Sequence, residues 1–209
     1  MGIQLRSTPH VLFFVVMLPA LSFGVGWLFA QALPDVPFWV ETISPLAAYG
    51  ILYRLFEVYI WHWPIFRWLG IVNVPDMRGR WLGEQTSSYK DENGKPRKAR
   101  VIMEVRQTFS DIHVETFYKN WQTEHSVASF VRVDSTFMLL VLFEAAPKVE
   151  YDGTATAHKG VMRLVQQTPG RLVGSYFNAA GRHGELTFRR TRYTLHRTFE
   201  SLGDQSTST

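Results

Sequence analysis

The chain has 209 residues, of which 46% are hydrophobic. This length suits a membrane module with one soluble domain of about 120 residues, and it excludes a large multidomain enzyme. Its 22 Lys and Arg residues against 18 Asp and Glu residues give a formal net charge of +4. That charge is too weak for a dedicated binder of nucleic acid polymers, yet it allows attraction to phosphate groups. The absence of cysteine excludes disulfides, thiolate chemistry and cysteine-based zinc sites.

Residues 11–33 form an uncharged apolar run. As a helix, this run would reach about 34 Å, which exceeds the roughly 30 Å hydrocarbon core of a bilayer. A secretory signal peptide is the alternative, because Arg6 precedes the run and small residues lie near its end. The apolar region of a signal peptide has only about 7 to 15 residues, however, and here a second apolar stretch follows. The run therefore predicts a retained membrane-spanning helix.

A second apolar stretch begins at Ile43 and predicts a second span at Ile43–Trp61. Arg54 and Glu57 lie three residues apart on one helical face, where pairing would reduce the cost of placing charge in lipid. Pro64 is expected to end the helix or turn it along the surface. Aromatic residues of the kind found at a membrane interface surround this proline: Tyr59, Trp61, Trp63 and Trp68.

The charged residues that flank the two predicted spans set their expected orientation. The connector at residues 34–41 contains Asp35 and Glu41 but no Lys or Arg. Basic residues lie before the first span and after the second: Arg6, Arg67, Arg78 and Arg80. By the positive-inside rule, we expect a two-pass membrane protein with both termini in the cytoplasm.

From Val74 onward, helical periodicity gives way to runs of about ten residues in which apolar and polar side chains alternate. Turn-forming segments separate these runs, such as T-P-G at residues 168–170. Successive antiparallel strands most economically close into an up-and-down barrel, because closure leaves no exposed strand edge. Eight strands are predicted: Arg80–Tyr89, Arg97–Phe109, Ile112–Trp121, His125–Asp134, Thr136–Ala145, Lys159–Gln167, Leu172–Asn178 and Gly184–Arg192.

The expected fold is therefore mainly β, with two N-terminal transmembrane helices followed by an eight-stranded antiparallel up-and-down β-barrel. We place the two-helix region at residues 1–72, a linker at 73–78 and the barrel at 79–197. Residues 198–209 are mostly small and polar and are expected to form a disordered tail.

Gly79-Arg80-Trp81 opens the first predicted strand and resembles the glycine-x-tryptophan start of lipocalin-like barrels. In those barrels the indole plugs one end, so a structural role is expected for Trp81. The last strand ends in Arg189-Arg190-Thr191-Arg192. These arginines either cover the indole by a cation–π contact or bind lipid phosphate.

Alternation also predicts which side chains face the barrel lumen, although a one-residue slip would invert any strand. We place the less charged phase of each strand inward, for example Trp81 and Gly83. A lumen that only packs itself favours aliphatic residues, because a buried unpaired polar group costs about 1–3 kcal/mol. Polar residues in this phase therefore indicate a wet cavity for one ligand, unless some of them point outward. They are Gln85, Tyr89, Gln107, Thr116, Tyr118, Asn120, Tyr176, Asn178 and Arg190.

The sequence has no pattern typical of catalysis or metal binding. Its histidines are scattered, and the G-x-S-x-G motif, the P-loop and the dinucleotide-binding glycine pattern are missing. Carboxylates of the strand region lie at strand ends or in the outward phase: Asp111, Glu115, Asp134, Glu144 and Glu150. We therefore expect a binding protein, without a metal or a cofactor, rather than an enzyme.

Four short motifs occur in a specific order along the chain. They are Y-R-L-F-E-V-Y-I-W at Tyr53–Trp61, P-D-M-R-G-R-W-L-G at Pro75–Gly83, L-V-G-S-Y-F-N at Leu172–Asn178 and G-E-L-T-F-R-R at Gly184–Arg190. With the two apolar runs before them, they resemble the membrane effectors of bacterial CBASS antiphage systems, described as SMODS-associated two-transmembrane, β-strand-rich effectors. The resemblance extends from the first apolar run to about Arg192.

The resemblance implies a cytoplasmic barrel that binds a cyclic dinucleotide made by a cognate nucleotidyltransferase. Binding would drive homo-oligomerisation in the bacterial inner membrane, disrupt the membrane lipid and kill the infected cell. A cyclic dinucleotide has two bases and two phosphates, so its site needs planar faces for stacking and donors for anionic oxygens.

From the predicted lumen we assign stacking to Tyr89, Tyr118 and Tyr176. Hydrogen-bond donors are assigned in the same way: Gln107, Asn120, Asn178 and Arg190. Arg54 and Glu57 would be inter-helix partners in the assembly, with an intrahelical pair as an equal alternative. Two other classes stay open: a membrane-tethered, lipocalin-like carrier or sensor of a lipid or small apolar ligand, and a structural barrel with a filled lumen that docks a partner.

Overall fold

The computed structural model describes residues 8–32, 38–90, 92–133, 136–147, 157–192 and Leu195. The described residues divide into two compact units. Among these residues, the helical unit contains those up to Pro75 together with Thr108–Ser110, and the barrel unit contains those from Asp76 to Gln107 and from Asp111 onward. The predicted tail at residues 198–209 lies outside the described residues.

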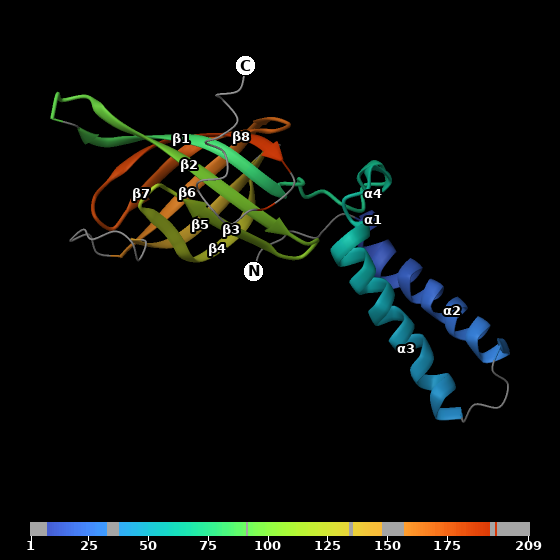
Figure 1. Ribbon diagram of the computed structural model, residues 1–209. Helices are drawn as coiled ribbons and strands as arrows, with labels where there is room; N and C mark the ends of the chain where they lie inside the picture. The colour runs from blue at the N-terminus through green and yellow to red at the C-terminus, as the bar shows by residue number, and fades with distance from the viewer. Residues whose placement is uncertain are drawn as a thin grey trace, which may run out of the picture. The chain divides into compact units, whose positions relative to one another are not determined.

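Two helical stretches make up most of the helical unit, drawn in blue and cyan in Figure 1. The first stretch consists of α1 (Thr8–Leu12), the π-helical segment η1 (Phe13–Met17) and α2 (Leu18–Ala32). The second consists of α3 (Phe38–Leu55) and the π-helical segment η2 (Phe56–Ile60). A short helix α4 (Pro64–Trp68) follows and begins at the predicted helix-ending proline, whose fixed φ suits a first helical turn.

In the part of the chain that the structure describes, no helix is both long enough and apolar enough to cross a membrane. The predicted spans at residues 11–33 and Ile43–Trp61 therefore do not appear as such. In the first run, η1 interrupts the α-helix and leaves α2 with 15 residues. The second helix, α3, has 18 residues but contains Glu41 and Arg54.

An aromatic cluster holds the helical unit together. Phe56 is 2% exposed, and its ring centroid lies 5.1 Å from that of Phe13 and 5.2 Å from that of Phe66. Phe109, from the tripeptide between two strands, stacks on Phe14 at 5.5 Å and contacts Phe56 edge-on at 5.2 Å. Burial of these rings contributes apolar stabilisation to the unit.

Hydrogen bonds to Glu57 fix the tripeptide Thr108–Ser110 in the helical unit. The amide of Phe109 donates to the carbonyl of Glu57 at 3.0 Å, and the Ser110 hydroxyl donates to Glu57 Oε1 at 2.5 Å. Arg54 Nη1 donates to the other carboxylate oxygen, Oε2, at 3.2 Å. The Arg54–Glu57 pair is thus intrahelical, and Glu57 also orients a turn that is distant in sequence.

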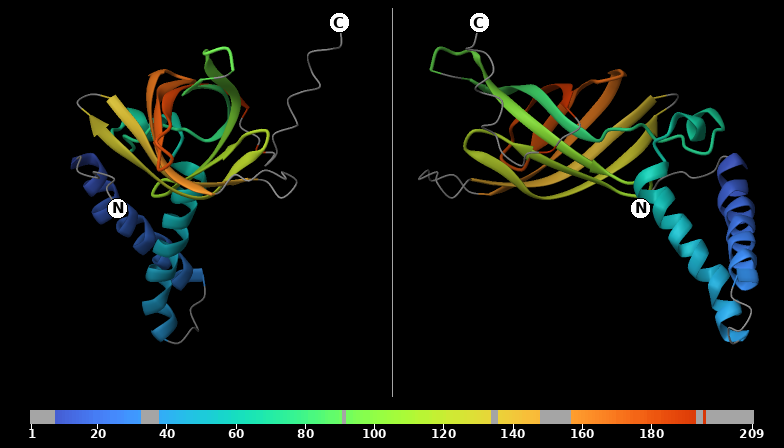
Figure 2. Two further views of the ribbon diagram at one scale, coloured as in Figure 1. Left: turned by 90° about the vertical axis from the view of Figure 1, so that its left-hand side faces the viewer. Right: turned by 45° about the vertical axis from the view of Figure 1, so that its right-hand side comes forward.

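The barrel unit contains eight strands in the order β1 to β8, closed by pairing of β1 with β8 (Figure 1; Figure 2, left). This confirms the predicted antiparallel up-and-down barrel. The strands are β1 (Gly79–Lys90), β2 (Pro96–Gln107), β3 (Ile112–Phe117), β4 (Trp121–Val133), β5 (Thr136–Pro147), β6 (His158–Thr168), β7 (Arg171–Asn178) and β8 (His183–Arg192).

The predicted inward phase is also the phase of the barrel core. Trp81 on β1 lies directly opposite Met103 on β2, and both side chains are fully buried. Other lumen-facing side chains on the remaining strands are at most 2% exposed: Val114, Leu139, Val141, Met162, Leu164, Leu172, Leu186 and Phe188. The barrel therefore packs its lumen with apolar side chains over much of its length.

Two predicted strand ends are wrong. The second strand was expected to continue to Phe109 but ends at Gln107, because the Phe109 ring is buried in the aromatic cluster of the helical unit. The third was expected at Ile112–Trp121 but ends at Phe117, because the Tyr118 amide donates to the Trp121 carbonyl at 2.8 Å and closes a turn. β4 consequently begins at Trp121 rather than at His125.

One end of the barrel is plugged by Trp81. Its indole Nε1 donates to the carbonyl of Met77 at 2.9 Å, and the Arg190 guanidinium lies 4.7 Å above the ring. Arg190 also donates to the carbonyl of Asp76, and the amide of Met77 donates to Gln107 Oε1 at 2.8 Å. The structural role predicted for Trp81 is confirmed, and the cation–π alternative is the one observed for Arg190.

Truncation of Phe109 should destabilise the helical unit. Phe109→Ala removes a ring that is 5% exposed, and the expected loss of unfolding free energy is about 3–5 kcal/mol. In thermal unfolding of the full chain, the midpoint temperature of the first transition should therefore fall strongly. Phe177→Ala, which truncates a ring that is 48% exposed, is the control and should change that transition little. Equal effects of the two substitutions would contradict this packing.

The plugged end should be sensitive to acid through Asp76. Burial raises the pKa of this carboxyl, but the hydrogen bonds and charge of Arg78 outweigh burial and hold the pKa below its ordinary value. Its stabilising contribution is therefore present above about pH 4 and is lost as the pH falls through the lowered pKa. In urea unfolding from pH 6 to pH 2, Asp76→Asn should be less stable at pH 6 and lose less stability on acidification. If the unfolding free energy fell equally with pH in Asp76→Asn and in the unmodified chain, Asp76 would not contribute to the acid sensitivity.

Candidate functional site

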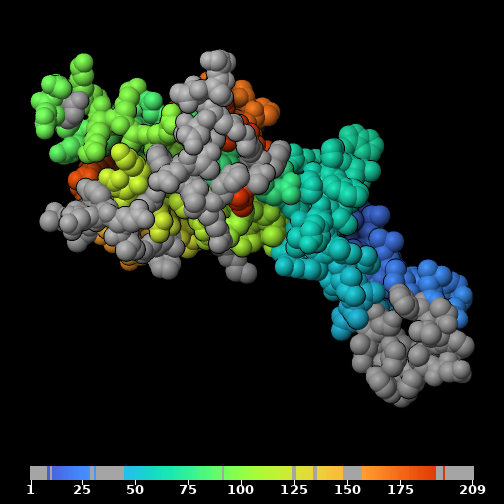
Figure 3. Space-filling model, viewed as in Figure 1, coloured from blue at the N-terminus to red at the C-terminus, as the bar shows by residue number. Residues whose placement is uncertain are grey.

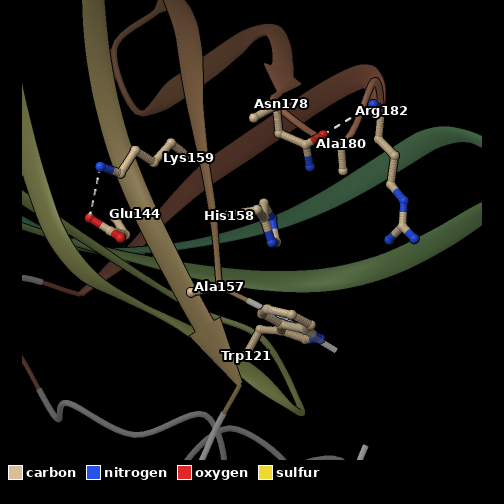
Figure 4. A pocket seen from close by; sticks show the side chains of 9 residues that line it. Trp121, Glu144, Ala157, His158, Lys159, Asn178, Ala180 and Arg182 are labelled. Atoms are coloured by element: carbon tan, nitrogen blue, oxygen red, sulfur yellow. Dashed lines mark hydrogen bonds and ion pairs between the residues drawn. The ribbon is translucent and has the colours of Figure 1, made fainter. Parts of the chain in front are cut away.

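The barrel end opposite the Trp81 plug carries a pocket of about 530 Å³, within the roughly 300–1,000 Å³ range of small-molecule sites. The start of β4, the end of β5, the start of β6 and the β7–β8 turn contribute its wall (Figure 4). Its lining residues are Trp121, Glu144, Ala157, His158, Lys159, Asn178, Ala179, Ala180 and Arg182. The lining thus combines planar, amide and cationic groups.

Two rings form the planar part of the pocket. The ring centroids of Trp121 and His158 are 5.0 Å apart, with 61° between their planes. Figure 4 shows the His158 ring between Trp121 on one side and Asn178 with Arg182 on the other. Indole and imidazole faces at a half-open mouth suit stacking of a nucleobase, because every base has a π-face.

The β7–β8 turn fixes the amide and the cation. The Arg182 amide donates to Asn178 Oδ1 at 3.0 Å, and the Asn178 amide donates to the Arg182 carbonyl at 2.9 Å. Gly181, with φ +72°, supplies the left-handed residue that this tight turn requires. The exposed Arg182 guanidinium lies 5.2 Å above the ring of Tyr89, which leaves its N–H groups available for an anionic oxygen.

Glu144 and Lys159 form the rim of the pocket rather than its interior. Lys159 Nζ lies 3.8 Å from Glu144 Oε2, and Figure 4 shows this pair on the opposite side of the strand from His158. Because successive side chains of a strand alternate, His158 faces the lumen while Lys159 faces outward. The carboxylate of the lining is therefore paired with a cation.

Below the mouth, tyrosine hydroxyls line the lumen. Tyr118 donates to Gln85 Oε1 at 2.6 Å, and Tyr176 donates to Ser87 Oγ at 3.0 Å. Burial, with a smaller contribution from the neighbouring Tyr176, raises the pKa of Tyr118 above its ordinary value. Tyr118 therefore remains a protonated donor at neutral pH, and the inner wall presents hydroxyl and amide groups toward the open end.

The structure brings together only part of the predicted ligand set. Tyr118 and Tyr176 lie in the lumen and Asn178 lines the pocket, while Tyr89 reaches the site through Arg182. The half-buried Asn120 lies in the β3–β4 turn.

Gln107 and Arg190 lie at the plugged end, where Met77, Asp76 and Trp81 engage their side chains. The structure therefore does not place these two residues with the pocket at the opposite end of the barrel.

Of the residues that line the pocket, only Asn178 was predicted, and the missed ones include its two rings and its exposed guanidinium: Trp121, His158 and Arg182. Trp121 was placed at the end of the third strand, whereas it starts β4 and shares the inward phase of Thr123. His158 was treated as one of the scattered histidines, although it continues the inward phase of Gly160 and Met162. Extending the sixth strand by its alternation would have found His158. Trp121 could not be found in this way, because a register shift between Thr123 and His125 inverts the alternation of β4.

No group of His, Asp or Glu side chains suited to a metal ion occurs among the described residues. The chemistry available at the mouth is stacking, hydrogen bonding and charge pairing. A closed barrel with one plugged end and a pocket at the other end has the architecture of barrels that hold one small ligand.

The particular family follows from a match to residues 72–190, over half of the chain. The matching family model is described as "Cap15, cyclic dinucleotide receptor domain". The chain belongs to this family, whose receptor domain is that of a CBASS effector activated by a cyclic dinucleotide. The family resemblance stated from the sequence motifs is confirmed.

Other comparisons add little. No curated protein matches the chain. Among solved structures, a redesigned β-barrel is similar to 56% of this chain and 92% of its own, with 10% sequence identity and a TM-score of 0.30.

Proposed function

We propose that the chain is an antiphage effector that binds a cyclic dinucleotide at the open barrel end and then disrupts the bacterial inner membrane. The match of residues 72–190 to the cyclic dinucleotide receptor domain carries this proposal. The pocket chemistry supports it, since the lining supplies planar rings, an amide and an exposed guanidinium. These are the groups that two bases and two anionic phosphates require.

Each ligand group has a counterpart in the pocket. Trp121 and His158 stack against a base, and the Arg182 guanidinium pairs with a phosphate oxygen. Asn178 uses its side-chain amide to recognise a base edge or a ribose. Tyr118 and Tyr176 form the polar floor below the ligand.

On this proposal the barrel is a receptor and not an enzyme. Glu144, the carboxylate of the lining, is paired with Lys159 on the outer side of the strand and does not face the lumen. Ligand binding can activate the protein only by shifting an equilibrium between two of its states. The ligand must therefore bind the active state more tightly than the inactive one.

The helical unit is the part of the chain that we expect to disrupt the membrane. Its two helical stretches, Thr8–Ala32 and Phe38–Ile60, carry large apolar side chains that are mostly exposed. Examples that are at least 60% exposed are Val15, Phe23, Trp27, Leu46 and Ile51. Lipid is the natural cover for such side chains, and the distribution of Arg and Lys in the flanks favours a two-pass arrangement with both termini and the barrel in the cytoplasm. Ligand-driven homo-oligomerisation of these helices would then disrupt the bilayer.

Substitutions in the pocket should weaken ligand binding. Trp121→Ala and Arg182→Ala should each lower the affinity of the purified full chain for its preferred cyclic dinucleotide by about 5- to 150-fold, because stacking on a base contributes about 1–3 kcal/mol. For Arg182 the physical reason is the loss of a charge-assisted hydrogen bond to a phosphate oxygen. Calorimetric titration against a panel of cyclic dinucleotides measures both changes. Arg171→Ala, at an exposed outward position of β7, is the matched control and should bind as the unmodified chain does. Absence of binding by any panel member would overturn the function, and unchanged binding by both pocket variants would overturn the site.

Membrane disruption should depend on the ligand. With the full chain reconstituted in vesicles of bacterial polar lipids, adding the cyclic dinucleotide should release an entrapped dye. Trp121→Ala should shift the ligand concentration for half-maximal release upward by the factor measured for its affinity. Dye release that is independent of ligand, or no release despite saturating binding, would contradict the proposed output.

A further inference from the structure

The outer surface of β4 to β7 carries an unusual pattern of apolar side chains. Val127, Leu142, Val161 and Phe177 lie directly opposite one another on four neighbouring strands. Directly opposite residues of paired strands share a face, so these four form one row across the barrel. Val127 is 68% exposed, Leu142 50% and Phe177 48%. The row therefore points outward, with three of its four side chains about half exposed or more.

A second apolar row lies four residues further along the same strands. It consists of Val131, Met138, Val165 and Val173, again directly opposite one another. Between the two rows lies a third made of Ser129, Leu140, Arg163 and Ser175. These three rows of four residues are called the apolar face below, and Arg163 is the one charged residue among them.

The other half of the barrel surface is different in kind. Outward positions of β1, β2 and β3 carry ion pairs that are at least partly exposed, Lys98 with Glu84 at 2.9 Å and Arg106 with Glu115 at 2.5 Å. The Arg80–Glu104 pair on β1 and β2, at 2.6 Å, is buried. The tips of β1 and β2 extend beyond the neighbouring strands on this side (Figures 1 and 3). The apolar face is thus a local feature of β4–β7 and not a property of the whole surface.

The composition of the apolar face is that of a protein interface. Interface cores are enriched in Phe, Met and Arg and depleted of Lys, Glu and Asp. The face contains Phe177, Met138 and Arg163, with valine at five other positions and no Lys, Glu or Asp. A surface that lies in an anionic lipid interface is instead rich in Lys and Arg around its apolar side chains. Protein is therefore the occupant that the composition favours.

The rows make this face complementary to itself. A two-fold axis parallel to the strands and between β5 and β6 would set each apolar row of one copy against the same row of the other. The same axis places Arg163 against Leu140 of the second copy rather than against its own counterpart. Ser129 of one copy would lie against Ser175 of the other.

The size of the face indicates weak association. Four strands about 4.8 Å apart and five residues at about 3.3 Å each, with side-chain width, give roughly 300–400 Å². A stable interface buries about 800 Å² on each partner. Pairing through this face alone is therefore transient, and it becomes effective when a second contact or a shared membrane raises the local concentration.

We propose that the apolar face of β4–β7 is the surface through which barrels of two copies of this chain pair. This inference rests on the proposed function, because ligand-driven assembly would bring two copies of the chain together. It identifies the surface through which the two barrels would then contact each other. The pocket lies at the mouth of the same strands, so β4, β6 and β7 each carry both a pocket residue and residues of the face.

Charge reversal of the face tests the proposal. Leu142→Glu and Phe177→Glu place carboxylates at exposed apolar positions, where pairing would bury them. In detergent, the full-length variants should bind the cyclic dinucleotide within about twofold of the unmodified chain. Their ligand-driven assembly, followed by light scattering, should require at least tenfold more protein. Thr86→Glu, at an outward position of β1, is the control and should assemble normally.

Cysteine cross-linking tests the geometry independently of the ligand, because the chain has no cysteine of its own. Ser129 and Ser175 of one barrel are separated by two intervening strands, which places their Cα atoms roughly 14 Å apart. Facing sheets pack about 10 Å apart, which is too far for a direct disulfide but within reach of a short bismaleimide linker. At high protein concentration with such a linker, the double variant Ser129→Cys, Ser175→Cys should form a covalent dimer, and each single variant should form much less.

The outcomes separate the two proposals. No binding of any cyclic dinucleotide would overturn the proposed function while the cross-link still tests the face. Normal binding with normal assembly of both charge variants, or a double-cysteine variant that cross-links no better than the single variants, would overturn the face.

Discussion

The pairing of β1 with β8 is the constraint on which the rest of the barrel depends. Closure removes both free strand edges and divides the side chains of every strand into a lumen set and an outer set. It also brings Arg190, near the end of the chain's last strand, over Trp81 at the start of the first. The plug exists only because the sheet closes, and with that end occupied a ligand has one mouth to enter.

Polarity changes along the lumen from the plug to the mouth. Trp81, Met103 and Phe188 fill much of the closed end and the middle, where the buried hydroxyls of Thr116 and Thr123 contact each other. Toward the mouth, Tyr118 and Tyr176 introduce hydroxyls that are hydrogen-bonded within the wall. The mouth itself presents rings, an amide and a cation. The barrel thereby combines a mainly apolar, stabilising core with a polar candidate site at its open end.

Much of this arrangement could be predicted from the sequence, because alternation with period two is a local property. The eight strands and their inward phase follow from it, whereas the role of Trp81 follows from the resemblance of Gly79-Arg80-Trp81 to the start of lipocalin-like barrels. The β3–β4 turn could not be predicted in the same way, since Tyr118, Lys119 and Asn120 include neither Gly nor Pro. That turn is held by pairing between β3 and β4, including a contact of the Thr116 and Thr123 hydroxyls. Because the turn was expected after Trp121, this residue was assigned to the end of the third strand and not to the start of β4.

Other errors came from contacts that are distant in sequence. Phe109 continues the alternation of its strand, yet its ring is buried against Phe14 and Phe56, about 95 and 53 residues earlier in the chain. Arg190 and Gln107 have the residue types and the phase of ligand donors, but their position along the barrel axis assigns them to the plug. The phase of the alternation predicts which side of a strand a side chain faces. Its position along the barrel axis depends instead on the register of all eight strands.

The central claim is that the nucleotide binds at the open end of the barrel. Amide hydrogen exchange of the full chain with and without a saturating cyclic dinucleotide tests it most directly, because protection reports where the backbone becomes ordered. The account predicts added protection at the β3–β4 turn, the start of β6 and the β7–β8 turn, with little change around Trp81 and Arg190. Protection confined to the plugged end, with none at the mouth, would contradict it.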